Sequence, residues 1–334
     1  MTTQVAARIA VADGAPCPTL VLDRHRLPRE EPALRAELAR IRRWLLRTGR
    51  GHVMKFALCS ASDRPGYDLE YRFVQCLPGR APHFDHRSRC GHSLLAGVVA
   101  TLPGTTRSRR VRDGAADVHC EPGPGGSWSL QYARLPSPPL TRLLPTGSGT
   151  DRLRTPEGDH EVSLVDFGNP YAFVAAESLG LGSARELYGA GAESLGRLRS
   201  LRAAAARALR CPEDGALPKI AAVGAWEPGH LTVRSVTGTG WHPTLAVTGA
   251  VCLAAAVAAG DVAGSTVPGR LAARTGCGPV ALRLRTARDT VTVSAVTGRS
   301  PAGETCLRAV GVGPKRARVL EEITEPLWRT RASA

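Results

Sequence analysis

The feature that most constrains the fold of this chain is a short uncharged run, Leu94 to Ala100. It follows directly on Arg89-Cys90-Gly91-His92-Ser93, so small and polar residues lead into an apolar stretch. This order predicts a helix buried on all sides, whose first turn keeps unpaired backbone N–H groups. Those groups and the positive end of the helix dipole can bind an anion and favour a thiolate at Cys90. Glycine at 91 lets a substrate approach the backbone closely.

Upstream, residues 52–60 read as a strand that places one lysine, Lys55, among apolar residues. The chain has only three lysines, at 55, 219 and 315, against 41 arginines. Arginine does not deprotonate in proteins, whereas a partly buried lysine can be tuned for proton transfer. Two plainer readings stay open: Lys55 extends from a strand edge into solvent, and Cys90 is a small core residue.

A length of 334 residues predicts two domains. We expect an N-terminal domain of residues 1–150 plus about 316–334, and a C-terminal domain of residues 151–315. Residues 135–157 are rich in Pro, Ser, Thr and Gly and predict the linker between them.

The formal net charge of +15 raises the possibility of a nucleic-acid partner. The arginines are spread over most of the chain without aromatic interleaving, which favours a solvated basic surface that attracts small acidic molecules. We therefore expect an acidic small-molecule substrate and no nucleic-acid partner.

The nine cysteines form no CxxC pair and no zinc-like spacing. With no secretory signal, this pattern predicts reduced thiols in the cytoplasm and no metal site. No apolar run reaches ~18 residues, so we expect no membrane segment. The oligomeric state stays open, with a homodimer as one option.

Taken in order, the elements predict a duplicated unit. Residues 5–12 and 19–23 alternate like a hairpin, a helix follows over 29–47, and strands are expected at 53–58 and 68–76 before the Cys90 helix. The second half shows a strand at 161–167 with a turn at 168–170, a helix over 195–209, a strand at 218–223 and a helix over 248–259. Each half thus places a lysine strand before a small-residue turn and a buried helix. Two such helix N-termini facing one cleft make a natural anion site.

Several segments carry a family resemblance by their order and spacing. They are the Lys55 strand, Asp68–Gln75, Cys90-Gly91, Val165–Pro170, Arg197–Ala205, Pro218–Ile220, Ala246–Cys252 and Arg316–Arg318. In these the chain resembles the 2-methylaconitate cis-trans isomerase (PrpF) family, which includes 4-oxalomesaconate tautomerases and methylitaconate isomerases.

The resemblance implies an α/β diaminopimelate-epimerase-like fold: two pseudo-symmetric domains, each a curved sheet around a central helix, with the active site in the cleft between them. It also implies proton transfer without a cofactor. Lys55 falls on the family's acid/base lysine and Cys90 on the thiol of its Cys-Gly-Asn turn. The substrate-binding candidates are Gly91, His92, Ser93, Asn169, Thr248 and Gly249, with Asp13, Cys17 and His242. The second catalytic cysteine that epimerases carry at the second helix is absent, which disfavours two-thiol racemisation.

The chain departs from the family pattern in its first hairpin. Arg-Gly-Gly-Thr-Ser-Lys-Gly is usual there, whereas this sequence reads Ala12-Asp13-Gly14-Ala15-Pro16-Cys17-Pro18. Asp13 and Cys17 sit in this altered loop, and two readings stay open for them: contact with the substrate, or turn chemistry alone. The change removes much of the expected grip on a tricarboxylate and favours a different substrate, from secondary metabolism.

Two histidines keep more than one reading. His92 replaces the family's asparagine and can orient Cys90, donate a hydrogen bond, or cap the helix. His242 can line the site or form a structural hydrogen bond.

We therefore predict a cis-trans or allylic isomerase of an unsaturated carboxylic acid, with Lys55 as the first choice for proton transfer and Cys90 second. The alternatives are a racemase or epimerase, a non-catalytic ligand-binding member of the fold, and an arginine-mediated nucleic-acid binder.

Overall fold

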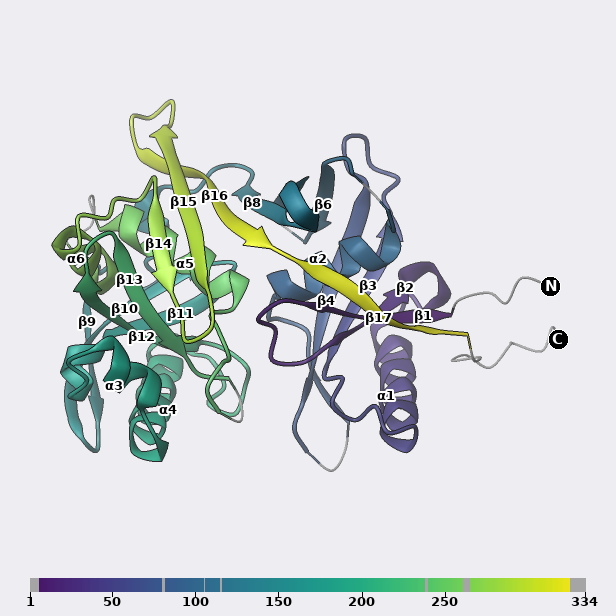
Figure 1. The fold of residues 1–334 in the computed structure, drawn as a ribbon, viewed down its shortest axis with the longest axis horizontal. Coiled ribbons are helices and arrows are strands. Elements are labelled where there is room, and N and C mark those ends of the chain that lie inside the picture. The colour runs from purple at the N-terminus through teal and green to yellow at the C-terminus, as the bar shows by residue number, and fades with distance from the viewer. Residues whose placement is uncertain are drawn as a thin grey trace. The chain divides into compact units, whose positions relative to one another are not determined.

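The computed structural model describes residues 6–79, 82–104, 106–114, 116–237, 240–260 and 265–324 (Figure 1). Contacts between residues group the chain into two compact units: unit 1 is 1–114 with 316–334, and unit 2 is 115–315. Unit 2 thus begins before residue 150, because the strands that follow residue 115 pair with one another and with a later strand of the same unit. The return of the chain to unit 1 falls at 316.

Unit 1 is built on a mixed sheet in the order β17-β1-β2-β3-β4, in which β4 also pairs with β5 and β6. The strands are β1 (Ala7–Ala12), β2 (Thr19–Asp23), β3 (Lys55–Ala61), β4 (Leu69–Leu77), β5 (His83–Asp85), β6 (Arg109–Asp113) and β17 (Ala317–Ile323). A one-turn helix η1 (Arg24–Arg26) follows β2. The hairpin predicted at 5–12 and 19–23 is confirmed, since β1 and β2 pair antiparallel.

Two helices cover opposite faces of this sheet. Helix α1 (Glu31–Arg47) buries Leu34, Leu38, Ile41 and Leu45, a stripe at helical spacing, in one core with Phe56 and Leu58 of β3. Helix α2 (Gly91–Thr101) contacts β1, β2, β3, β4 and β17, and a Cβ at Gly97 would meet Ala57 and Cys59. Because side chains alternate along a strand, the odd-numbered residues of β3, Lys55 among them, face α2.

Helix α2 is the buried central helix that the uncharged run predicts. Nine of its residues are buried, from Gly91 to Ala100 with Val99 excepted. Cys90 precedes it in an extended conformation, with φ −145°. A helix that is apolar on every side has to sit inside a core, and the sheet of unit 1 curves around it.

Unit 2 is built on a larger sheet in the order β9-β10-β11-β12-β13-β14-β15-β16-β8-β7. Its strands are β7 (Ala116–Pro122), β8 (Trp128–Arg134), β9 (Asp151–Thr155), β10 (Gly158–Phe167), β11 (Asn169–Ala175), β12 (Lys219–Glu227), β13 (His230–Ser235), β14 (Leu282–Arg285), β15 (Thr290–Arg299) and β16 (Thr305–Lys315). Its helices are α3 (Ala184–Gly189), α4 (Ala192–Ala208), α5 (Val247–Ala259) and α6 (Val267–Arg274), with short 3-10 turns η2 (Pro124–Gly126), η3 (Leu140–Leu143) and η4 (Ala176–Leu179).

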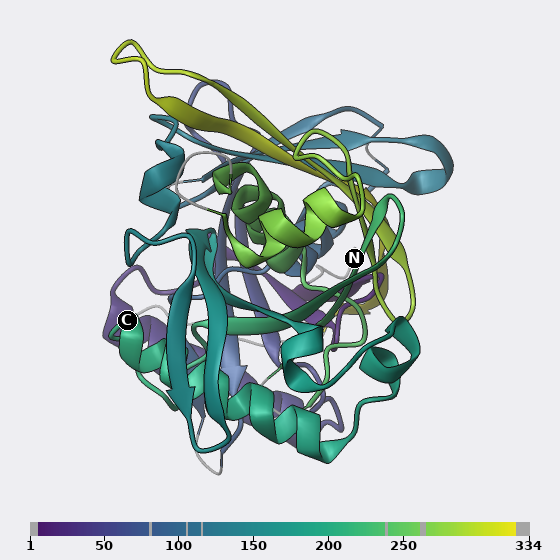
Figure 2. The same cartoon turned by 90° about the vertical axis from the view of Figure 1, so that its left-hand side faces the viewer.

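Helix α5 is the central helix of unit 2. All thirteen of its residues are buried, and it contacts β10, β11, β15 and β16. Figure 2 shows α5 and α6 enclosed by strands, with the β15–β16 hairpin crossing above them in that view. The second buried helix expected from the sequence is therefore confirmed.

The expected duplication is visible in the element order of the two units. In unit 1 a β1–β2 hairpin is followed by α1, β3 runs parallel to β2, and β4 returns antiparallel before α2. In unit 2 the β10–β11 hairpin, α3 and α4, parallel β12 and antiparallel β13 precede α5. Lys55 opposes Thr19 in the first case and Lys219 opposes Tyr171 in the second.

Residues 135–157, predicted to be a linker, carry structure of unit 2 instead. They contain η3, whose Leu140 and Leu143 are buried and which contacts α5, and also β9, which pairs with β10. The Pro- and Gly-rich composition there reflects tight turns between short elements. No helix in the described part of the chain is long and apolar enough to cross a membrane.

Candidate active site

Lys55 and Cys90 come together in unit 1. Lys55 is the first residue of β3 and is 5% exposed, and Cys90 immediately precedes α2 and is 9% exposed. The two meet because the α2 face of β3 carries the Lys55 side chain to the helix N-terminus. The Lys55 ammonium group donates a hydrogen bond to the thiol of Cys90.

The pKa of the Cys90 thiol is lowered from its ordinary value of 9.0. Burial acts the other way, because it disfavours the charged thiolate. The positive charge of Lys55 opposes it, together with hydrogen bonds from the Ser93 hydroxyl, the Ser93 backbone N–H and the Lys55 ammonium. The surroundings of Cys90 therefore favour its thiolate more than those of an ordinary cysteine do.

Ser93 is itself tied to the sheet. It is fully buried in the first turn of α2, and its hydroxyl lies 2.9 Å from the hydroxyl of Thr19, which opposes Lys55 in the β2–β3 pairing. The Tyr71 hydroxyl donates a hydrogen bond of 3.0 Å to the Cys90 carbonyl. Strand β2 thus holds Ser93, and strand β4 holds the backbone carbonyl of Cys90.

Cys17 is a second thiol at the same end of β3. The backbone N–H of Met54, the neighbour of Lys55, hydrogen-bonds its sulfur, and the charges of Lys55, Cys90 and Arg42 act on it. Burial raises the pKa of the Cys17 thiol, and Cys90 adds to the rise, while Lys55, the Met54 N–H and Arg42 oppose it. At a pH between the two pKa values, Cys17 is therefore protonated while Cys90 is ionised.

The remaining unit 1 candidates fall in two groups. Gly91 and His92 are buried in the first turn of α2, next to Cys90. Asp13 is exposed at the end of the β1 hairpin, 3.6 Å from Arg318 in an ion pair. Of the two residues predicted in the altered loop, the structure thus brings Cys17 to the Lys55–Cys90 pair, and Asp13 to β17.

Unit 2 has a corresponding arrangement at the N-terminus of α5. Gly168 has φ +97° in the tight β10–β11 turn, which leaves Asn169 buried at the start of β11. The Asn169 amide donates a hydrogen bond of 3.2 Å to the hydroxyl of Thr248 in the first turn of α5. Gly249 follows, and a Cβ at that position would lie 2.6 Å from the Tyr171 hydroxyl.

His242 is buried on the approach to α5. Its Nδ1 accepts the backbone N–H of Thr244 at 3.2 Å, which is a local structural bond of the kind the sequence allowed for. Within the described residues, no group of three or more His, Cys, Asp or Glu side chains is arranged to hold a metal ion.

A family model described as PrpF protein matches residues 108–310, which is more than half of the chain. The chain belongs to the PrpF family. The matched residues include Asn169 and Thr248, whereas Lys55 and Cys90 precede them.

Two relatives of this PrpF-family chain are isomerases by name. The putative isomerase YraM of Bacillus subtilis (strain 168) is 32% identical over 180 residues, 48% of each chain. The 3-methylitaconate isomerase of Eubacterium barkeri is 28% identical over 156 residues, 38% of this chain and 40% of that protein. The chain thus spans about half the length of these relatives.

The crystal structure of a methylitaconate-delta-isomerase matches the PrpF-family chain over nearly its whole length. The TM-score is 0.63 at 20% identity, with 99% of this chain and 98% of that chain covered. This likeness confirms the expected diaminopimelate-epimerase-like fold.

Three residues of the unit 1 site carry no clear sequence signal. Thr19 and Tyr71 are strand residues whose roles depend on pairing with distant segments. Arg42 lies in α1 and is buried, with bonds to the carbonyls of Gly51 and Val53 and to the Met54 sulfur. A basic residue beside the apolar stripe of α1 is the one signal that could have identified it.

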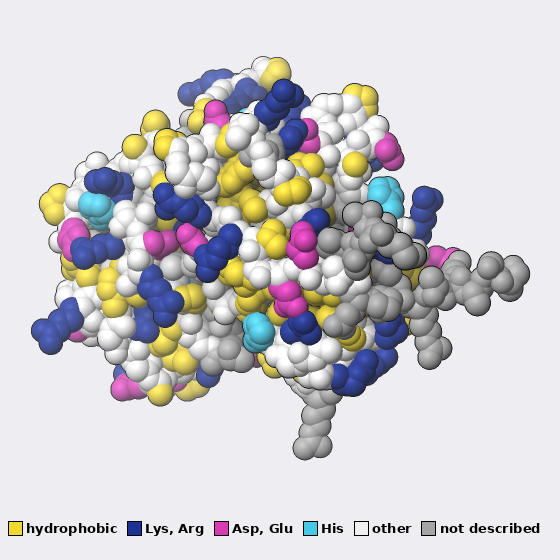
Figure 3. Space-filling model, turned by 45° about the vertical axis from the view of Figure 1, so that its right-hand side comes forward, with side chains coloured by type: hydrophobic (Ala, Val, Ile, Leu, Met, Phe, Trp, Pro, Cys, Tyr) yellow, Lys and Arg dark blue, Asp and Glu magenta, His cyan; other side chains and the backbone are white. Residues whose placement is uncertain are grey.

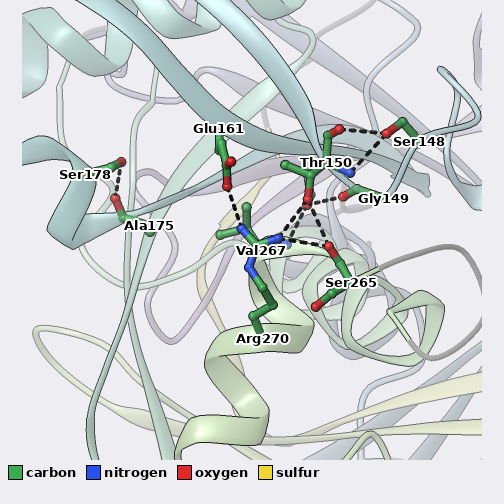
Figure 4. Close-up of polar contacts among 10 residues, drawn as sticks. Ser148, Gly149, Thr150, Glu161, Ala175, Ser178, Ser265, Val267 and Arg270 are labelled. Atoms are coloured by element: carbon green, nitrogen blue, oxygen red, sulfur yellow. Dashed lines mark hydrogen bonds and ion pairs between the residues drawn. The ribbon is translucent and has the colours of Figure 1, made fainter.

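A surface hollow of about 500 Å³ lies elsewhere in unit 2, beside α6 and Cys277. Its two arginines are already paired, Arg270 with Glu161 and Arg274 with Glu177. Figure 4 shows Arg270 also bonded to Thr150 and to the Ser265 carbonyl, which joins α6 to the start of β9. These contacts serve the fold of unit 2.

On the face in Figure 3, basic side chains are scattered with acidic ones between them.

Proposed function

We propose that this PrpF-family protein is a cofactor-independent isomerase that shifts or rotates the double bond of an unsaturated carboxylic acid by proton transfer. The observation that carries the proposal is the hydrogen-bonded pair of Lys55 and Cys90, a buried cation beside a thiol whose pKa is lowered. The relative named 3-methylitaconate isomerase supports an unsaturated dicarboxylic acid as the substrate class.

The first step is removal of a proton from the carbon next to the double bond. The Cys90 thiolate is the base, since it is the group whose charged form its surroundings favour. The electron pair of the broken C–H bond moves into the conjugated carboxylate, which becomes an enolate. Such an enolate forms only if donors already aimed at it stabilise its charge. The Lys55 ammonium and the positive end of the α2 dipole supply that stabilisation.

The second step returns a proton to a different carbon. The double bond then lies between two new carbons, or, after rotation in the enolate, has the other geometry. Lys55 takes part as the group that can both hold and release a proton beside Cys90, which arginine cannot do.

Substrate contacts in unit 1 are assigned to Gly91, His92 and Ser93, with Cys17 and Asp13 as further candidates. The candidates of unit 2, considered by itself, are Asn169, Thr248, Gly249 and His242. The altered loop 12–18 lacks the polar side chains of the family pattern. We therefore infer a substrate with fewer carboxylates than 2-methylaconitate, from secondary metabolism. The nine free cysteines support a reducing, cytoplasmic location.

The test is proton NMR of the purified chain in D2O with 3-methylitaconate and a panel of unsaturated mono-, di- and tricarboxylic acids. We expect deuterium to enter the allylic position of at least one acid while new alkene signals appear, and Cys90→Ala to remove both changes. A wild-type chain that leaves the whole panel unchanged contradicts the proposal. Exchange at the α-carbon of an amino acid in a parallel sample supports the racemase alternative instead.

A further inference from the structure

We propose that Cys17 is a further catalytic residue, the acid that delivers a proton to the second carbon after Cys90 has removed one from the first. This inference rests on the isomerase function proposed above and assigns the step that function leaves open.

Cys17 lies close to Lys55 and Cys90. The Met54 N–H bonds its sulfur, Lys55 is the next residue, and the Lys55 ammonium bonds Cys90. The charge of Lys55 thus acts on both thiols. Cys17 is partly exposed, whereas Cys90 is buried.

The surroundings of the two thiols favour different protonation states. Both thiols are desolvated. Among the described residues, Cys90 has three hydrogen-bond donors, one of them the Lys55 ammonium, whereas Cys17 has one, the Met54 N–H. Cys76 and Arg42 also face Cys17, and burial raises the pKa of the Cys76 thiol to about 12. Two thiols whose surroundings push their pKa values apart supply one base and one acid.

The altered hairpin gains an explanation. Pro16 and Pro18 flank Cys17 and fix the backbone φ on both sides of it. The loop lacks the polar side chains of the family pattern, and it holds one side chain that carries a proton, Cys17. The second thiol that is absent from the start of α5 is thus present in unit 1, on another element.

The proton balance closes over one turnover. Cys90 gains a proton from the first carbon and becomes a thiol, while Cys17 gives its proton to the second carbon and becomes a thiolate. Lys55 then donates a proton to Cys17 and takes one from Cys90, which restores the starting forms. Loss of Cys17 therefore blocks the second transfer and leaves the first intact.

The experiment compares two signals of one NMR sample in D2O with 3-methylitaconate: deuterium entering the allylic position, and migration of the double bond. In Cys17→Ala and Cys17→Ser we expect exchange to continue and migration to fall about 10²- to 10⁴-fold. The serine variant keeps the size of the side chain and an acceptor for the Met54 N–H. Cys211→Ala, a partly exposed thiol of unit 2, is the matched control and should change neither signal.

A role in structure alone lowers both signals together, and unchanged migration in both Cys17 variants removes Cys17 from the reaction. Either result overturns this inference and leaves the isomerase function standing. If the wild type shows neither signal with any acid of the panel, the isomerase function fails, and this inference fails with it.

A second measurement needs no substrate. Thiolate absorbance at 240 nm is followed against pH in the wild type, Cys17→Ala and Cys90→Ala. We expect the step lost in Cys90→Ala to lie below pH 9.0 and the step lost in Cys17→Ala to lie above it. The reverse order overturns the assignment of acid and base.

Discussion

The hydroxyl oxygens of Thr19 and Ser93 lie 2.9 Å apart, and the direction of their hydrogen bond follows from the second partner of Ser93. The Ser93 hydroxyl has one proton, which it donates to Cys90. Thr19 must therefore donate to Ser93. A chain of donors runs from β2 through the first turn of α2 to the thiolate, and each bond polarises the next.

Loss of these hydrogen bonds should disfavour the Cys90 thiolate and destabilise the fold. We expect Ser93→Ala to raise the pKa of Cys90, and Thr19→Val to raise it by less. Each change should lower the free energy of unfolding by about 0.5–1.5 kcal/mol. The double variant, measured by urea unfolding, should show a coupling of about 0.5 kcal/mol or more. A coupling of zero shows that the two hydroxyls do not interact.

Lys55→Met should slow turnover strongly and raise the pKa of Cys90, because the positive charge that lowers this pKa is gone. The fold should persist, since the thiol can become neutral once its cation is removed. We expect a loss in kcat of about 10²-fold or more. Circular dichroism checks that the fold persists, and thiolate absorbance at 240 nm checks the pKa of Cys90.

Lys55→Arg is the matched control, because it keeps the positive charge but cannot release a proton. It should keep the pKa of Cys90 low and still be inactive. Activity close to wild type in this variant limits Lys55 to an electrostatic role.

The pH dependence of kcat/KM should follow the two thiols. Below the lowered pKa of Cys90 the base is protonated, so activity rises as pH increases through that pKa, which lies under 9.0. Activity falls again where Cys17, with its raised pKa, loses its proton. A profile on 3-methylitaconate should therefore be bell-shaped. Ser93→Ala should move only the rising limb, toward higher pH.

Asn169→Ala should affect unit 2 and leave the pKa values of Cys90 and Cys17 unchanged. It removes the donor to Thr248 in a buried place and leaves a hydroxyl short of one bond, at a cost of about 1–3 kcal/mol. The thiolate titration of the variant should match the wild type. If Asn169 contacts substrate as proposed, KM rises as well. An unchanged KM with lowered stability assigns Asn169 to the fold alone.

Gly249→Ala should destabilise unit 2 strongly for so small a change. The new Cβ would lie 2.6 Å from the hydroxyl of Tyr171, a buried ring that stacks on Phe173 with centroids 5.4 Å apart. We expect a loss of about 1–3 kcal/mol in urea unfolding. Gly196→Ala, at an exposed helical site of α4 with nothing within 4 Å, should instead stabilise by about 0.5–1 kcal/mol.

The sequence by itself determined the elements that local pattern controls. The uncharged runs after Cys90 and Thr248 dictated two buried helices, because such a helix can only be stable inside a core. The scarcity of lysine singled out Lys55, and the residues before the first buried helix singled out Cys90. The repeat of strand, helix and strand was also readable, since each half uses the same short signals.

The tertiary structure decided which distant residues join that pair. Thr19 meets Ser93 only because β2 runs parallel beside β3 with a helix between them in the chain, and such long-range pairing leaves no local trace. Cys17 comes beside Lys55 for the same reason. The protonation of the two thiols follows from this packing, because burial, charge and donor count depend on neighbours that the sequence keeps far apart.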